Sequence, residues 1–339
     1  MIPHNRPTLG KQEIEAANRV IVSAALAQGK EVEAFEEEIC NYLGYEKGHA
    51  IAVSSGSAAL YLAIKAIEKC RTVHKVAVPA YSCVALTNAV ALAGLETVCA
   101  DVEKDSPNID LADNRLISAD LTIACHMYGM PLPINNDYII EDCAQAIGAA
   151  VNGKKVGTQT NTSVFSFYAT KPITSGGEGG MVFSKDRSLI EYLKDIRDYD
   201  MKGDTIRRFN FKMTDLQAAI GRVQLKKLDS FVEKRRYLAD RYQSKGIPLW
   251  NRCEEGIEYR GLIKSSNPIK LLKYLKDNGI SAIIPIEERE LLCDSQNVPR
   301  AYELTKTLVS IPLYPSLTDG EQDVIINALI QYMNDEGKL

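Results

Sequence analysis

The feature that most limits the fold of this chain is a regular alternation of short apolar runs with helix-patterned segments between residues 49 and 186. The first pair is HAIAVSS (49–55), which predicts a buried strand, and SAALYLAIKAIEKC (57–70), which predicts an amphipathic helix. Further strand-like runs are KVAVPAYS, ETVCADV, LTIACHMYG, DYIIEDCA, SVFSFYA and GGMVFSKD. Strands that alternate with helices favour a mostly parallel sheet with helices on both faces. We therefore expect an α/β fold.

The sequence pattern changes after about residue 240, and 339 residues are enough for two domains. Residues 214–237 predict one long helix, capped by Thr214 or Asp215. The segment 267–286 predicts a helix followed by a strand, and residues 318–333 predict a final helix. We expect a large domain over residues 1–238 and a smaller α+β domain over residues 239–339.

Charge and hydropathy exclude two classes of partner. The net charge of −4 argues against sequence-independent binding of nucleic acid, which needs a basic surface. The run Val76–Leu95 has no charged residue, but Pro79 and several polar residues divide it, so we expect no membrane span. The N-terminus lacks the apolar stretch of a signal peptide, and the eight cysteines form no CxxC pair. We expect a cytoplasmic protein with free thiols and no metal site.

A lysine and an acid follow two of the predicted strands. Lys171 stands after VFSFYAT, before a loop rich in glycine and serine, and Asp142 ends the strand in DYIIEDCAQ. In parallel sheets, ligands gather beyond the C-terminal ends of the strands. The pair suits pyridoxal phosphate, which needs an amine for covalent attachment and an acid beside its pyridine nitrogen. Taken singly, Lys171 also fits a solvated surface lysine, and Asp142 a turn former or helix cap.

Other polar residues stand near the same strand ends. The turn Ser54–Ala58 joins a strand to a helix N-terminus, where free N–H groups favour a phosphate, although many such turns are only caps. Ser166 can add a hydroxyl group, and Gln145 can bond the cofactor's phenolic oxygen or be a polar loop residue. His126 also lies at a strand end, where we expect a structural role, and no histidine–carboxylate cluster indicates a metal.

With these residues in place, the chain resembles the DegT/DnrJ/EryC1/StrS family of pyridoxal-phosphate-dependent sugar aminotransferases. The resemblance covers most of residues 2–235 and resumes at 310–329. It rests on separated blocks in the family's order: RPTLGKQEIEAA, AQGKEVEAFEEEI, VSSGSAALYLAI, VPAYSCVALTNAVALAGLETVCADV, IIEDCAQAIGAAVNGKKVG, SFYATKPITSGGEGGMV and FNFKMTDLQAAIGRVQLKKLD. It implies the fold-type I architecture of pyridoxal phosphate enzymes, with a mostly parallel sheet between helices.

The resemblance also implies roles for single residues. Lys171 matches the lysine that holds the cofactor covalently and shuttles the proton. Asp142 matches the partner of the pyridine nitrogen, and Gln145 matches the contact to the ring hydroxyl. A lysine at position 171 argues against the family's dehydratase branch, which has histidine there.

The phosphate site is implied in the same way. Gly56, Ser57 and Ala58 match the turn that surrounds the phosphate, and Ser166 matches a hydroxyl donor. Asn210, in FNFKMTD, matches an asparagine that reaches the phosphate from the opposite subunit. The resemblance therefore implies a homodimer with shared active sites.

Two segments depart from the family pattern. Cys83 stands where many relatives have an aromatic residue that stacks on the cofactor ring, so either this thiol or another side chain such as Tyr81 covers the ring. Residues 280–298 differ from the histidine-containing segment that helps to shape the sugar site in relatives.

We therefore expect transamination from glutamate to a nucleotide-linked keto sugar, in the biosynthesis of cell-surface polysaccharide or of an aminosugar-bearing metabolite. Arg207, Arg208 and Lys212 flank Asn210 and are candidates for holding a diphosphate, or form a solvated basic stretch. Two alternatives stay open at this point. One is an aminotransferase that acts on a cyclitol or another cyclic ketone, and the other is a catalytically idle regulatory relative.

Overall fold

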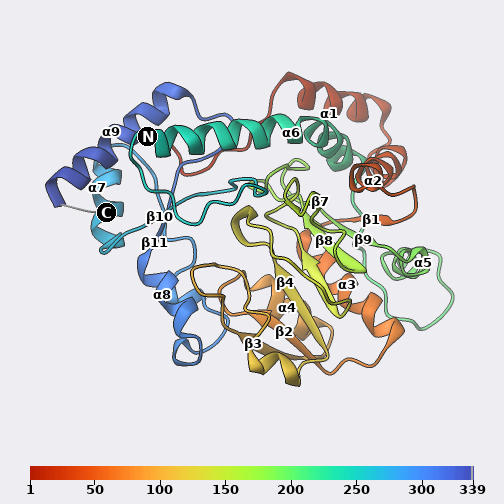
Figure 1. Ribbon diagram of the computed structural model, residues 1–339. Coiled ribbons are helices and arrows are strands. Elements are labelled where there is room, and N and C mark those ends of the chain that lie inside the picture. The colour runs from red at the N-terminus through yellow and green to blue at the C-terminus, as the bar shows by residue number, and fades with distance from the viewer. Residues whose placement is uncertain (337–338) are drawn as a thin grey trace.

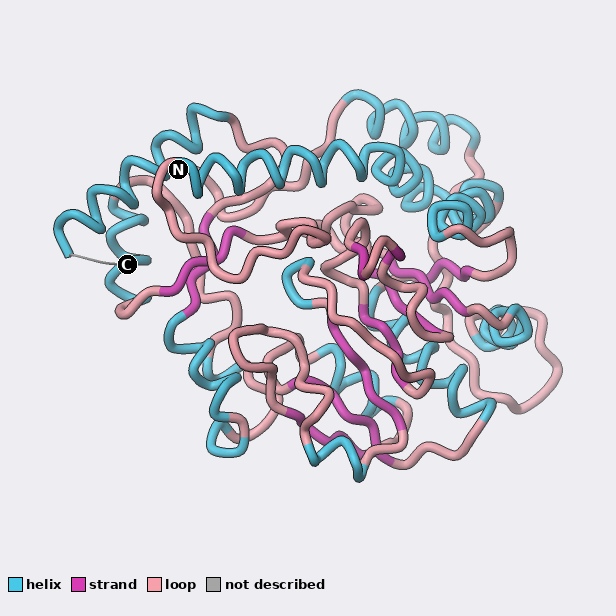
Figure 2. The backbone as a smooth tube through the Cα atoms, viewed as in Figure 1, coloured by secondary structure: helices cyan, strands magenta, loops and turns pink. Residues whose placement is uncertain are grey.

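A seven-stranded sheet forms the centre of the computed structural model, which describes residues 1–336 and 339 (Figures 1 and 2). The strands run in the order β1-β9-β8-β5-β4-β2-β3, and β9 is antiparallel to both of its neighbours while the other pairs are parallel. Their bounds are β1 Ala50–Val53, β2 Lys75–Pro79, β3 Glu96–Ala100, β4 Leu121–Cys125, β5 Ile139–Asp142, β8 Thr162–Ser166 and β9 Gly180–Ser184. The mostly parallel α/β sheet predicted from the sequence is confirmed.

Helices flank this sheet. The helices of the first two hundred residues are α1 Lys11–Ser23, α2 Lys30–Leu43, α3 Gly56–Cys70, α4 Ala85–Leu92 and α5 Arg187–Ile196. The second to fifth of these contact strands directly, and α3 contributes eight buried side chains to the main core. Two short antiparallel strands, β6 Ala150–Val151 and β7 Lys154–Lys155, are joined by a turn at Asn152 and Gly153, so the segment GKKVG (153–157) includes β7. The uncharged run Val76–Leu95 divides into β2, a loop and α4, as predicted. Among the helices of the described residues, none has the length and apolar character to cross a membrane.

The long helix α6, Asp215–Ser244, spans the molecule along the top of Figure 1. Thr214 begins it with a reciprocal cap: the Thr214 hydroxyl accepts from the Gln217 N–H, and the Gln217 side chain accepts from the Thr214 N–H. One end of α6 packs on α1 and α2, whereas Leu238 and Tyr242 at the other end join a second hydrophobic core.

This second core belongs to the C-terminal part of the chain. The elements of this part are β10 Gly261–Lys264, α7 Pro268–Asp277, α8 Pro299–Thr307, β11 Leu308–Ile311 and α9 Asp319–Glu336, with β10 and β11 paired antiparallel. Of these, α8 packs its buried residues Ala301 and Leu304 into the main core instead. The predicted boundary between residues 238 and 239 falls inside α6, so we propose that this helix is shared by the two parts.

The strand that the sequence predicts at the end of segment 267–286 does not form. Ile280 and Ile283 make only isolated bridges, to Ile2 and Ser310. Pro285 has no N–H for a strand ladder, and it lines a pocket together with Ile286. The end of the apolar run therefore serves as a pocket wall, whereas Ile280 is buried in the second core.

Candidate active site

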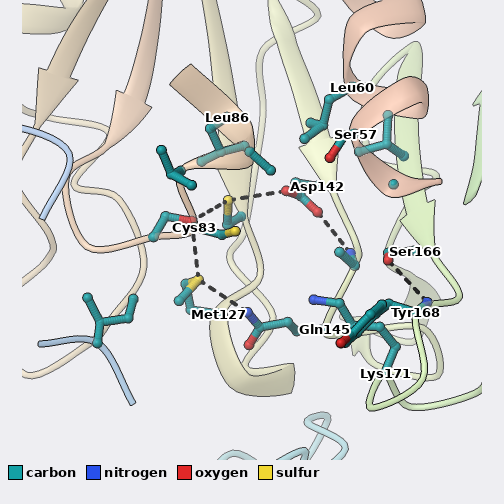
Figure 3. Close-up of a pocket in the computed structure, with 18 of the residues that line it drawn as sticks. Ser57, Leu60, Cys83, Leu86, Met127, Asp142, Gln145, Ser166, Tyr168 and Lys171 are labelled. Atoms are coloured by element: carbon teal, nitrogen blue, oxygen red, sulfur yellow. Dashed lines mark hydrogen bonds between the residues drawn. The ribbon is translucent and has the colours of Figure 1, made fainter. Parts of the chain in front are cut away.

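A cavity of about 860 Å³ opens where β1, β2, β4, β5 and β8 end. Its volume lies in the range of small-molecule sites. The predicted residues that line it are Gly56, Ser57, Asp142, Gln145, Ser166 and Lys171. Because parallel strands bring their C-terminal ends to one edge, residues more than a hundred positions apart meet there (Figure 3).

The N-terminus of α3 forms the polar turn at one end of the cavity. Ser55 caps this helix: its hydroxyl accepts from the Ala58 N–H at 3.2 Å, and its carbonyl accepts from the Ala59 N–H at 3.0 Å. The N–H groups of Gly56 and Ser57 have no partner among the described residues. A Cβ atom on Gly56 would lie 2.9 Å from the Ser166 Oγ atom, so a larger residue would displace the turn. Free N–H groups at a helix N-terminus favour an anion.

Asp142 ends β5 as a buried carboxylate without a cationic partner among the described residues. One oxygen accepts from the Ala144 N–H at 2.9 Å, and the other accepts from the Cys125 thiol at 3.5 Å. Burial, and then the Asp142 charge, raise the pKa of Cys125 well above its ordinary value, so the sulfur keeps its proton and acts as the donor. Figure 3 shows these contacts converging on the carboxylate. The carboxylate can therefore accept a further hydrogen bond from a donor group on a ligand.

Gln145 lies across the cavity from the α3 turn. Its Oε1 atom accepts from the Tyr128 N–H at 2.9 Å, which fixes the orientation of the side-chain amide. Its Nε2 atom lies 4.0 Å from the Met127 sulfur, a weak contact that leaves the amide N–H groups available to a ligand. Tyr128 itself has φ near 55°, a conformation uncommon for tyrosine, which indicates a locally constrained backbone.

Lys171 enters the cavity from the loop after β8. Its Nζ atom makes no hydrogen bond and no ion pair with the described residues. The loop is held at the Thr170 carbonyl, which accepts from Asn5 Nδ2 at 3.1 Å and from the Tyr259 hydroxyl at 3.0 Å. Figure 3 shows Lys171 beside Tyr168 and Gln145. The structure thus supplies a fixed backbone and an uncommitted amine.

Glu141, the neighbour of Asp142, points to the other side of the sheet, as alternation along a strand predicts. It is fully buried and accepts from the N–H groups of Gly157 and Thr160 at 2.7 and 2.8 Å, and from His126 Nε2 at 3.2 Å. Burial raises its pKa, but the hydrogen bonds from His126, Thr160 and Gly157 prevail and hold it below its ordinary value.

His126, Glu141 and Cys143 are close enough to hold a metal ion, but their hydrogen bonds oppose it. His126 Nδ1 accepts from the Leu132 N–H at 3.0 Å, so the ring proton lies on Nε2 and points to Glu141. A metal on Nε2 would need that lone pair free. His126 therefore has the structural role expected from the sequence.

Residues 7–330 match the model of the DegT/DnrJ/EryC1/StrS aminotransferase family. The chain belongs to this family. The protein is thus an aminotransferase, an assignment that the alignment with relatives along the full chain also supports. A GDP-perosamine synthase of Vibrio cholerae is 30% identical over 98% of this chain and 100% of that protein. The spore coat polysaccharide biosynthesis protein SpsC of Bacillus subtilis is 27% identical over 97% of this chain and 96% of that protein.

Solved structures show the same fold. PseC of Helicobacter pylori, an aminotransferase of pseudoaminic acid biosynthesis, superimposes with a TM-score of 0.86 at 23% identity, over 98% of this chain and 99% of that one. DesV of S. venezuelae gives a TM-score of 0.86 at 26% identity over 94% of each chain. A putative sugar aminotransferase of Streptococcus pneumoniae in its PLP form gives 0.83 at 22% identity, over 96% and 97% of the two chains.

Several predicted site residues of this aminotransferase do not line the cavity. Ala58 is buried, and its N–H is already bonded to Ser55. Asn210 and Arg207 are exposed outside the cavity. The remaining two candidates are engaged in ion pairs: Arg208 with Asp195 at 2.8 Å and with Asp204, and Lys212 with Asp198 and Asp200 at 3.0 and 2.7 Å.

The cavity wall also includes residues that the sequence did not reveal. Tyr128, Tyr259, Arg260, Arg289 and Glu290 all face it. Spacing alone could not find them, because they come from a loop after β4, from the start of β10 and from the divergent segment 280–298. Only Arg260 has a recognisable sequence signal, because it is a basic residue directly before an apolar strand.

The two candidates for covering a cofactor ring lie in different places. Cys83 is exposed and lines the cavity. Tyr81 is fully buried behind the wall, where its hydroxyl accepts from the Tyr128 hydroxyl at 3.2 Å. The geometry thus favours Cys83.

Proposed function

We propose that this aminotransferase moves the amino group of glutamate to a nucleotide-linked keto sugar, with pyridoxal phosphate as its cofactor. The names of its relatives support the substrate class: one is a GDP-perosamine synthase, and another acts in spore coat polysaccharide biosynthesis. By this analogy the product serves a cell-surface polysaccharide or an aminosugar-bearing metabolite. The observation that carries the proposal is the meeting of Lys171, Asp142 and the α3 turn in one cavity.

The lining residues fit pyridoxal phosphate. The free N–H groups of Gly56 and Ser57, with the Ser166 hydroxyl, suit its phosphate. Asp142 has an unused acceptor for the pyridine N–H, and Gln145 has unused donors for the phenolic oxygen. When bound, the cofactor supplies a ring that withdraws electrons from the α-carbon of the amino donor.

Lys171 has two tasks in this proposal. Its uncommitted Nζ atom would hold the cofactor covalently at rest. When the donor binds, the freed amine takes the proton from the donor's α-carbon, and in the second half of the cycle it returns a proton to the carbon that receives nitrogen. Asp142 would accept the hydrogen bond of the pyridine N–H, and the hydrogen bonds at the Thr170 carbonyl hold the backbone beside Lys171.

We further propose a homodimer whose sites are shared. Asn210 is exposed and outside its own cavity, which fits a residue that serves the partner's phosphate site. Large apolar side chains are exposed nearby at Tyr199, Met201 and Ile206. In the dimer, Arg207 is a candidate for the diphosphate of the partner's substrate.

Replacing Lys171 with alanine tests the proposal. We expect Lys171→Ala to lose transamination by at least about a thousandfold, because the proton transfer loses its base. The readout is oxoglutarate released from glutamate with a panel of nucleotide-linked keto sugars and free cyclic ketones. If the enzyme turns over only the free cyclic ketones, its substrate is a cyclic ketone and the assignment of a nucleotide-linked sugar is wrong.

A covalent readout accompanies the kinetics. After borohydride treatment of the loaded wild-type protein, peptide mass spectrometry should place the cofactor on Lys171 and leave the variant unmodified. A cofactor found on another side chain, or full turnover by Lys171→Ala, would contradict the proposal.

A further inference from the structure

One arginine in the cavity wall has no assigned task. Arg260 lies directly before β10 and lines the same cavity as Lys171. Its neighbour Tyr259 donates a hydrogen bond to the carbonyl of Thr170, the residue before Lys171. The guanidinium also lies over the rings of Tyr128 and Tyr259, at 5.8 and 5.3 Å from their centres. Arg260 therefore belongs to the part of the wall that adjoins the reacting amine.

The guanidinium of Arg260 has no anionic partner among the residues that the structure describes. Within the described part of the chain, no carboxylate forms an ion pair with it. Its Nη1 atom contacts His4 Nε2 at 3.1 Å, and burial, then the Arg260 charge, lower the pKa of His4 to about 3. His4 is therefore a neutral acceptor at ordinary pH, one that also bonds the Ser310 hydroxyl.

Two nitrogen atoms of Arg260 have no hydrogen-bond acceptor among the described residues. Its Nε atom is buried without a hydrogen-bond partner, and its Nη2 atom bonds to none of the described residues. A charged donor that is removed from water and left unpaired is costly, so this arrangement favours an anion supplied by a ligand.

The other charged groups of the wall differ from Arg260. Arg289 pairs with Glu287 at 2.9 Å, and its side chain is 81% exposed. Glu290 accepts from the Glu287 N–H at 2.8 Å and forms no ion pair with Arg260. Arg260 thus combines a position in the wall, partial burial and the lack of a counterion.

We propose that Arg260 binds the α-carboxylate of the amino donor. This inference rests on the proposed function, which brings two anions to the cavity: the donor's carboxylate and the diphosphate of the keto sugar. The α-carboxylate is attached to the carbon at which Lys171 moves the proton, whereas the sugar ring separates the diphosphate from the reacting carbon. The link from Tyr259 through Thr170 to Lys171 places Arg260 on the reacting side. A guanidinium also matches a planar carboxylate in two parallel hydrogen bonds.

The test separates the two half-reactions in the cofactor-loaded enzyme. Arg260→Met removes the charge at similar length, and Arg260→Lys keeps it. Arg236→Met is the matched control, because the Gly256 carbonyl is the one acceptor of Arg236 among the described residues and Arg236 does not line the cavity. Circular dichroism and thermal melting verify folding.

We expect Arg260→Met to raise the glutamate concentration that half-saturates the first half-reaction by about ten- to a hundredfold. Arg260→Lys should recover part of this loss, and the KM for the keto sugar should change by less than about threefold. Calorimetric titration with glutarate, which cannot react, should show the same loss of binding in Arg260→Met and none in Arg236→Met.

The outcomes distinguish this inference from the function on which it rests. If the wild type does not transfer nitrogen from glutamate, the proposed function fails. If the wild type does so and Arg260→Met binds glutamate and glutarate equally well, the inference alone is overturned. A rise confined to the KM of the keto sugar also overturns it and moves Arg260 to the diphosphate.

Discussion

Asp142 and Glu141 show how two adjacent acids take different tasks. Asp142 faces the cavity with one strong and one weak donor, which leaves it free for a ligand. Glu141 faces inward, where backbone and side-chain donors use its acceptor sites and fix the loop at Gly157–Thr160. Alternation along β5 alone separates the two functions.

Glu141→Gln should destabilise the protein, because the amide turns an N–H group toward N–H donors that are already buried. We expect the free energy of unfolding to fall by about 2–4 kcal/mol. Denaturant titration measures it, with Glu303→Gln, an exposed site on α8, as the control. A cost below that of the control variant would mean that the buried bonds contribute nothing.

The pKa of Glu141 adds a pH dependence. Because the folded pKa lies below the ordinary value, the stabilising contribution is complete above that value and disappears as the pH falls through the folded pKa. The stability of the wild type should therefore fall more steeply in acid than that of Glu141→Gln. Parallel curves of unfolding free energy against pH for the two proteins would contradict this.

At the residue scale, the sequence predicted the site residues that stand at the end of a predicted strand. Lys171 follows an apolar strand and Asp142 ends one, so an α/β pattern places them at one edge. The sequence did not predict that Arg260 lines the cavity. Its position depends on how the C-terminal part packs against the sheet, and hydrophobic periodicity does not encode this packing. Whether Asn210 reaches a second subunit likewise depends on assembly.

At the scale of the elements, the contacts that connect α2 and α6 lie at the ends of these helices. Asp215, the first residue of α6, accepts from the N–H groups of Gly29 and Val32 at 2.7 and 3.1 Å. Gly29 is the N-cap of α2 and has no side chain to cap it, so α6 caps α2. A Cβ atom at Gly29 would lie 2.9 Å from Asp215 Oδ2, which explains glycine at this position.

Asp215→Ala should therefore destabilise α2 rather than α6. We expect a loss of about 1–2 kcal/mol in unfolding free energy and faster hydrogen exchange at the first-turn amides of α2. The control is Asp240→Ala on the same helix, which removes a carboxylate that is 70% exposed. Unchanged exchange in α2 would show that the inter-helix cap is unimportant.

Element types were largely predictable, because strands and helices here follow hydrophobic period and cap chemistry. The prediction of a strand near residues 280–286 was wrong: Ile280 is buried in the second core, whereas Pro285 and Ile286 line the cavity. Periodicity reports burial, and burial against a cavity has the same pattern as burial in a sheet.

At the scale of the whole molecule, the shared-site dimer predicts complementation between two defective variants. Lys171→Ala and Asn210→Asp each damage both sites of their own homodimer. In a mixed dimer, one site has the intact Lys171 of one subunit and the intact Asn210 of the other. After unfolding and refolding together, we expect about a quarter of wild-type activity.

The matched control mixes Lys171→Ala with Asp142→Ala, two residues that line the cavity of the same chain. No mixed dimer of this pair has an intact site, so activity should stay absent. Recovery in the control, or none in the Asn210→Asp mixture, would contradict a site built from two subunits.

The antiparallel strand β9 has a consequence for how the chain emerges from the ribosome. β1 is made first, yet the strand beside it in the sheet is β9, with Ala50 opposite Phe183 and Val53 opposite Gly180. The earliest strand therefore waits until the loop bearing Lys171 and the strand after it have been synthesised. Until then its apolar edge is open, so the nascent protein is most vulnerable to aggregation while the middle of its message is being translated.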